Sequence, residues 1–135
     1  MTTTTSTTSV AQATTPYEGL ISLAREAALL GSTASLLNWD QETMMPPGGL
    51  AYRSRQLACL ASLHHGVLTD PRLGEHLAAC ESDQALMADP IGPAAVNVRE
   101  LRRLYDRQRK LPRSLVEELA RTTSLAQHEW AEARR

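Results

Sequence analysis

Apolar side chains recur every three or four residues along the first part of this chain, and this spacing constrains the fold more than any other feature. The positions on the resulting stripe are Leu20, Leu23, Ala27, Leu30, Ala34 and Leu37. Residues spaced in this way lie on one face of an α-helix. An apolar face of that length has to be covered, so the first helix requires a partner helix.

Four further segments show helical signals, at about Leu50–Gly66, Asp70–Ser82, Ala94–Lys110 and Leu111–Arg135. Asp70-Pro71 is a start signal, because Asp caps free backbone amides and Pro suits the first helical position. Asp89–Pro93 is a turn-rich break. The apolar positions of these helices are Leu50, Leu57, Leu60 and Leu63, then Leu73, Leu77 and Cys80, then Val98, Leu101 and Tyr105, and finally Leu115, Leu119, Ala126 and Trp130.

No segment alternates with period two over a length that would indicate a strand, so the chain is predicted to be all-α, with about five helices packed as an antiparallel helical bundle. The hydrophobic content of 42%, the aromatic content of 4% and the absence of Phe imply a core of Leu and Ala, which suits helices better than strands. No apolar run approaches the roughly 20 residues that cross a bilayer. A net charge of −1 implies no general attraction to nucleic acid or to acidic membranes.

The chain divides at residue 16. Residues 1–16, MTTTTSTTSVAQATTP, carry no charged side chain and are predicted to form a disordered Thr-rich tail, neither a secretory signal nor a mitochondrial presequence. Residues 17–135 are predicted to form the helical segment. The last helix reaches Arg135 without a Gly or Pro stop signal, which suggests a truncated chain.

Histidines suggest two candidate metal sites. The first, His128-Glu129-Trp130-Ala131-Glu132, resembles the zinc motif H-E-x-x-H, but Glu132 replaces the second His and no third ligand follows at a suitable spacing. A solvated helix face is the favoured interpretation. The second candidate combines His64, His65 and His76. Adjacent helical histidines point about 100° apart, so surface or helix-end positions are favoured.

Three other features bear on possible chemistry. Cys59 and Cys80 form no CxxC motif and are interpreted as buried, reduced thiols. Between Arg99 and Arg113 lie seven of the chain's 14 basic residues, and Tyr105 could stack on a base there. Intrachain pairing, as between Arg103 and Asp106, or cover by another part of a larger protein, explains this segment better than nucleic-acid binding. The chain has no P-loop, no dinucleotide-binding glycine pattern and no G-x-S-x-G motif.

The stretch LLNWDQETMMPPGG, residues 36–49, interrupts the first helix, which is expected to end near Trp39 and Asp40, and Pro46-Pro47 cannot continue it. Trp39 is expected to plug the corner between two helices, so that its removal would cost about 3–5 kcal/mol. Asp40 is expected to cap the amides of residues 41–43, and Met44 and Met45 to fill gaps beneath the turn. The residues alone leave open whether this stretch is a corner or an active-site loop.

The same stretch resembles the beginning of the carboxypeptidase Taq family of metallocarboxypeptidases. RSRQLACLASLHH, LTDPRLGEHL and VRELRRLYDRQRKLPRSLVEELARTTSLAQHEWAEAR follow in the order of the family, and the resemblance covers residues 20–135. It implies one wall of a larger all-helical, neurolysin-like peptidase fold with a long groove. It also implies metal-dependent release of single residues from peptide C-termini, usually with zinc, by cytosolic homodimers.

The H-E-x-x-H motif and the other catalytic positions of the family lie downstream of the matched part. The resemblance therefore assigns no catalytic, cofactor-binding or metal-binding residue here, and no cofactor is expected in this chain. It favours a corner over an active-site loop for residues 36–49. A peptide substrate is expected only for the complete enzyme, with neither nucleic acid nor membrane as a partner, and the isolated chain is expected to be inactive.

Two alternatives remain at this stage. One is a free-standing helical self-association or interaction module, and the other is a nucleic-acid binder that acts through Arg99–Arg113. In the complete enzyme, later helices are expected to cover Leu115, Leu119 and Trp130. Without those helices these apolar side chains are expected to be exposed, so the isolated chain is expected to form homo-oligomers or aggregates through its last helix.

Overall fold

The computed structural model describes residues 14–134, and over these residues it is all-helical, without a strand. The elements are α1 (Pro16–Thr43), the 3-10 helix η1 (Pro47–Gly49), α2 (Leu50–Leu68), α3 (Pro71–Ser82), α4 (Pro93–Gln108) and α5 (Arg113–Ala133). The prediction of an all-α fold is confirmed. Residues 1–13 of the expected Thr-rich tail lie outside the described residues.

Helix α1 begins earlier and ends later than the sequence signals suggest. The Thr15 hydroxyl accepts the Glu18 amide while the Glu18 carboxylate accepts the Thr15 amide, which forms a capping box, and Pro16 takes the first helical position. The helix continues past Trp39, and the amides of Met44 and Met45 both donate to the Asp40 carbonyl at 2.9 Å. Its end at Thr43 therefore corrects the expected end near Trp39 and Asp40.

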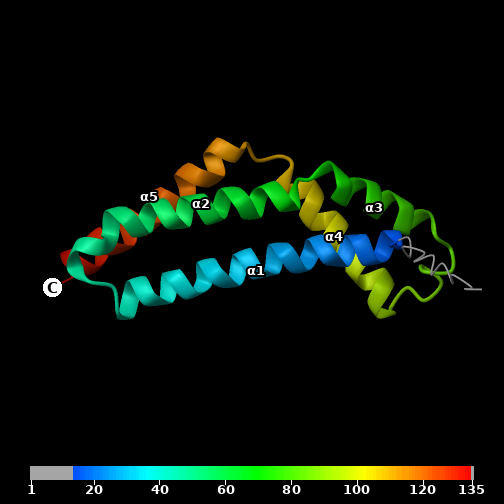
Figure 1. Ribbon diagram of the computed structural model, residues 1–135, viewed down its shortest axis with the longest axis horizontal. Helices are drawn as coiled ribbons and strands as arrows, with labels where there is room; N and C mark the ends of the chain where they lie inside the picture. Colours follow the sequence, from blue (N-terminus) through cyan, green and yellow to red (C-terminus); the bar gives the residue numbers. More distant parts are fainter. Residues whose placement is uncertain (1–13, 135) are drawn as a thin grey trace, which may run out of the picture.

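Helices α1 and α2 run antiparallel, and α5 packs against α2 (Figure 1). Helix α3 contacts the first part of α1, and α4 packs against α3 and crosses α1. The α1–α2 pair thus has α3 and α4 at one end, whereas α5 extends toward the corner that joins α1 to α2. The antiparallel arrangement is present for α1 with α2 and for α2 with α5, while α4 departs from it.

The buried core lies where α1, α3 and α4 meet. Its members are Leu20, Leu73, Leu77, Cys80, Val98 and Tyr105. Gly74 allows α3 and α4 to approach closely, because a Cβ at this position would lie 2.5 Å from the Tyr105 hydroxyl. The inward positions predicted for α3 are all buried, and Asp70 caps the helix by accepting the Arg72 amide, as the sequence indicated.

Helix α2 differs from its sequence prediction. Leu57 is buried, but Leu63 is 47% exposed and Cys59 is exposed, so the expected burial of both was wrong. The inward face of α2 instead includes small or polar side chains, with Ser54, Ser62 and His65 buried. Leucine spacing alone therefore predicts the inward face of this helix only in part.

By length and composition, α1 is long and apolar enough to cross a membrane, and it is the one such helix among the described residues. The sequence prediction that no apolar run has this length is corrected here. A core helix of a soluble protein has the same length and composition, so this property alone gives weak support for a membrane span.

Candidate functional site

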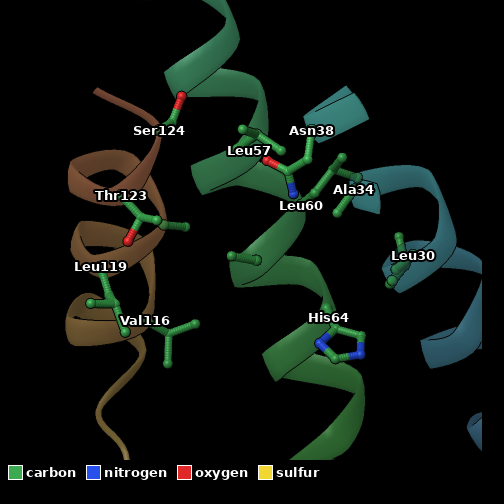
Figure 2. Close-up of a pocket in the computed structure, with 13 residues that line it drawn as sticks. Leu30, Ala34, Asn38, Leu57, Leu60, His64, Val116, Leu119, Thr123 and Ser124 are labelled. Atoms are coloured by element: carbon green, nitrogen blue, oxygen red, sulfur yellow. The ribbon is translucent and has the colours of Figure 1, made fainter. Parts of the chain in front are cut away.

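An apolar groove of about 360 Å³ lies between α1, α2 and α5. Figure 2 shows α2 in the middle of the groove, with Leu30 and Ala34 on the α1 side and Val116 and Leu119 on the α5 side. The complete lining is Leu30, Gly31, Ala34, Asn38, Leu57, Leu60, Ala61, His64, Val116, Leu119, Ala120, Thr123 and Ser124.

The groove contains no Asp, Glu, Lys or Arg side chain among its lining residues. Burial lowers the pKa of His64 below its usual value, and the neighbouring His65 lowers this pKa further, so the His64 imidazole is neutral at pH 7. A groove without formal charge attracts neither a phosphate nor a carboxylate. Its chemistry suits an apolar partner.

Helix α5 turns its most apolar stripe away from α2. Leu115, Leu119 and Trp130 are 51%, 63% and 64% exposed, and Ser124 is the residue that α5 buries. The sequence prediction that these three side chains would be bare is confirmed. Leu119 belongs both to this stripe and to the groove.

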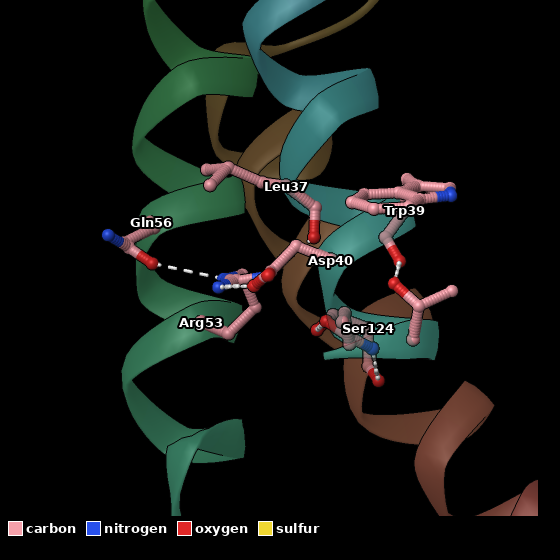
Figure 3. A network of polar contacts seen from close by, with 8 residues as sticks. Leu37, Trp39, Asp40, Arg53, Gln56 and Ser124 are labelled. Carbon is pink, nitrogen blue, oxygen red and sulfur yellow. Dashed lines mark hydrogen bonds and ion pairs between the residues drawn. The ribbon is translucent and has the colours of Figure 1, made fainter. Parts of the chain in front are cut away.

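A polar network fixes the corner between α1 and α2 (Figure 3). The Arg53 guanidinium forms an ion pair with Asp40 and also donates to the Leu37 carbonyl and to the Gln56 side chain. The Arg53 side chain is only 12% exposed, against 34% for Asp40. Asp40 therefore binds Arg53 of α2. The prediction that its side chain caps the amides of residues 41–43 was wrong.

Two further hydrogen bonds connect α1 to α5. The Gln41 amide nitrogen donates to the Ser124 carbonyl at 3.0 Å, and the Ser124 hydroxyl donates to the Gln41 amide oxygen at 2.7 Å. Ser124 is 2% exposed, so this pair satisfies a buried hydroxyl. Sequence reasoning missed Arg53, Gln41 and Ser124, because Gln41 and Ser124 are 83 residues apart and no local motif connects them.

Trp39 does not plug the corner. It is 59% exposed, since α1 continues through this position and turns Asp40, rather than the indole, toward α2. Met44 is 71% exposed, which also corrects its expected place beneath the turn, whereas Met45 packs against Gly49. The prediction that residues 36–49 form a corner between two helices agrees with the Asp40–Arg53 network. The positions predicted for Trp39 and Met44 within that corner were wrong.

The three histidines of the second candidate metal site have different surroundings. His64 lies in the groove, and His76 packs its ring over Gly19. His65 is 6% exposed, with its Nε2 atom 3.1 Å from the Gln108 carbonyl oxygen, and it lies in the last turn of α2, so of the expected surface or helix-end positions it takes the helix end. His65 is buried against α4 because it lies on the inward face of α2.

The His128 segment lines a second, more polar cavity of about 540 Å³ between α5 and residues 41–47. His128 and Glu132 lie there with Glu42 and Trp130. Over residues 14–134, no three His, Cys, Asp or Glu side chains are grouped so that they could hold a metal ion. The cavity therefore lacks a metal-binding set of side chains from the part of the chain that the structure describes.

Several arginines of the basic segment form ion pairs within the chain. Arg102 donates to Glu81 at 2.8 and 2.9 Å and lies 3.9 Å from Asp106, and Arg103 pairs with Glu100. Asp106 thus pairs with Arg102 and not with Arg103, which corrects the sequence prediction. Tyr105 is 5% exposed, so it offers no open ring face on which a base could stack.

Comparison with known proteins identifies a family and a relative to which this chain is similar. The family described as carboxypeptidase Taq (M32) metallopeptidase matches residues 19–135. Thermostable carboxypeptidase 1 of Thermus thermophilus is 48% identical over 118 residues, which make up 87% of this chain and 23% of that protein. The chain thus spans about a quarter of the length of this curated relative. The family match includes the groove and the polar network.

Proposed function

The chain belongs to the carboxypeptidase Taq (M32) metallopeptidase family, and we propose that it forms the N-terminal helical part of a carboxypeptidase that releases single residues from peptide C-termini. The observation that supports this proposal is the 48% identity over 87% of the chain. The aligned relative bears the name of a carboxypeptidase, and this chain corresponds to 23% of its length.

A metallopeptidase family implies a metal ion in the complete enzyme, and we propose zinc, as the family resemblance suggests. The residues described here do not fit such a site. His64, His65 and His76 lie in three different surroundings, and no group of three suitable donors exists within residues 14–134. The metal ligands and the catalytic base are therefore proposed to come from the part of the enzyme that this chain does not match.

The role proposed for this chain is to build one wall of the peptidase. The Asp40–Arg53 ion pair sets the angle between α1 and α2, and the Gln41–Ser124 hydrogen bonds hold α5 beside them. Three helices held in this way provide a rigid surface on which other helices can pack. Cytoplasmic location is part of the same proposal.

A chimeric enzyme tests the proposal. Residues 19–135 of this chain would replace the matching segment of the Thermus thermophilus carboxypeptidase, and release of the C-terminal residue from a blocked dipeptide would be measured. We expect the chimera to retain activity and to contain stoichiometric metal, and the isolated chain to show neither. Chelator-sensitive turnover by the isolated chain would overturn the proposal that the metal ligands and the catalytic base come from another part of the enzyme. A folded but inactive chimera would overturn the proposed role of this segment.

The second candidate function is a free-standing self-association module, in which case the chain forms homo-oligomers. The exposed stripe of α5 favours it, because soluble monomers rarely leave a large apolar patch uncovered. Sedimentation of the isolated chain would compare wild type with Leu119→Glu and with the control Ala79→Glu, at an exposed position of α3. Dimers that only Leu119→Glu dissociates would support this candidate, and a monomeric wild type would exclude it.

A further inference from the structure

The groove between α1, α2 and α5 combines three properties that together define what fits into it. It is about 360 Å³ in volume, it carries no charged side chain, and Gly31, Ala34, Ala61 and Ala120 contribute short side chains to its lining. Short side chains allow the backbone of a partner to approach closely, and the absence of charge selects an apolar surface.

The polar groups of the groove exclude an extended peptide as its occupant. The Ser124 hydroxyl and carbonyl are both engaged with Gln41. Asn38, Thr123 and His64 are the polar side chains that remain along the lining. An extended strand would bury backbone amides and carbonyls that these few groups could not satisfy, whereas a helix satisfies its own backbone. The groove therefore fits a helix.

The position of Leu119 indicates that this helix packs beside α5. Leu119 lines the groove and is 63% exposed, and Leu115, one turn earlier, is 51% exposed. A helix seated between α1 and α5 would cover both side chains and complete a group of four helices around the groove. Large apolar side chains of the incoming helix would fill the space above the small residues.

The comparisons favour one source for this helix. The groove and the α5 stripe lie entirely within the part of the chain that matches the family. The aligned relative has about three-quarters of its length beyond the segment that this chain matches. We propose that the groove receives an amphipathic helix from that remaining part of the peptidase chain, and that its uncharged, leucine-rich face contacts Leu30, Leu60 and Leu119. This inference rests on the proposed function.

Thiol labelling in the chimeric enzyme tests the inference independently of activity. In a Cys59→Ser background, Leu119→Cys reports on the groove, and Leu63→Cys is the matched control, because Leu63 is exposed on α2 and does not line the groove. Buried Cys80 reports whether the protein is folded. The rate of maleimide addition to each thiol would be followed by mass spectrometry, both in the isolated chain and in the chimera.

We expect the thiols at 119 and 63 to react at similar rates in the dilute isolated chain. In the folded chimera, the thiol at 119 should react at least about tenfold more slowly, since the docked helix must open to expose it, while the thiol at 63 should be unaffected. Equal rates in a folded, active chimera would overturn the inference and leave the proposed function intact.

The remaining outcomes also decide the question. Protection at 119 in the isolated chain that disappears on dilution would identify a second copy as the occupant and overturn the proposal. Protection that persists on dilution would show that the chain closes its own groove, with the same consequence. A chimera in which Cys80 is labelled has not folded, and this result would count against both the inference and the proposed function.

Discussion

The two ends of the α1–α2 pair bury their apolar side chains to different degrees. At the closed end, where the start of α1 meets α3 and α4, Leu20 and Leu77 are fully buried. At the open end, formed by the rest of α1, the first half of α2, and α5, Leu36 and Leu119 are both 63% exposed. Helices of similar composition thus form a core in one place and an uncovered surface in the other.

The difference shows what holds each end together. The closed end is joined mainly by apolar contacts among six buried side chains. At the open end, the Asp40–Arg53 ion pair and the Gln41–Ser124 hydrogen bonds join the helices in addition to the packing of α2 against α1 and α5. Polar contacts fix the angles between helices without covering their apolar faces, so the open end keeps a defined shape while its surface stays available.

The largest expected effect is a difference in the free energy of unfolding between variants in which one leucine at each end is replaced by alanine. Leu77→Ala at the closed end should lower the free energy of unfolding by about 2–5 kcal/mol, because it leaves a cavity in a packed core. The matched change Leu119→Ala at the open end should alter it by less than about 0.5 kcal/mol, since this side chain is largely solvated. Urea unfolding followed by circular dichroism would measure both. Equal losses would remove the distinction between the ends.

The second prediction concerns the polar contacts of the open end. Arg53→Met removes the ion pair with Asp40 and the hydrogen bonds to Leu37 and Gln56. We expect a loss of about 1–3 kcal/mol, because charged hydrogen bonds of a nearly buried guanidinium are broken. Arg55→Met, at an exposed position on the same helix, is the control and should change the free energy by less than about 0.5 kcal/mol. Indistinguishable variants would mean that the network does not stabilise the corner.

The third prediction tests the corrected position of Trp39. An indole that is 59% exposed should contribute little, so Trp39→Ala should cost less than about 1 kcal/mol. The fluorescence of Trp39, read in a Trp130→Tyr background, should show an emission maximum typical of a solvated indole. A loss of stability near that of Leu77→Ala would restore the sequence-based view that the ring plugs the corner.

Local signals predicted the closed end well. The Asp70-Pro71 start signal and the spacing of Leu73, Leu77 and Cys80 define α3 completely, and all three side chains are buried. Capping and periodicity act within one or two helical turns, so a single sequence contains them in full. The same holds for Val98 and Tyr105 on α4.

The open end was predicted less well, because its determinants are not local. The end of α1 depends on the Asp40 carbonyl, which accepts two amides, and the direction of its last turn depends on Arg53 in the next helix. The hydroxyl of buried Ser124 finds its partner in Gln41, which lies far from it in the sequence. Leucine spacing therefore assigned Leu63 to the interior, and the expected corner assigned Trp39 there, whereas pairing between distant polar residues orients the helices at this end.

The smallest expected effect is the dependence of stability on pH that arises from His64 at the open end. Burial, with a further contribution from His65, holds the pKa of His64 below its unfolded value of about 6.5. The unfolded chain therefore binds more protons between these two pKa values, so the contribution of His64 to stability is present above about pH 6.5 and is lost as the pH falls through the folded pKa.

His64→Gln should remove this contribution, so that unfolding free energies of wild type and variant diverge between about pH 7.5 and pH 5. The difference between the two curves isolates the effect of His64. The difference should be small, because the imidazole is only half-buried in a groove that still reaches solvent. In the chimeric enzyme, a helix seated over His64 would desolvate the imidazole further and enlarge the difference. Parallel curves in the chimera would therefore contradict a covered groove, even if the isolated chain behaves as expected.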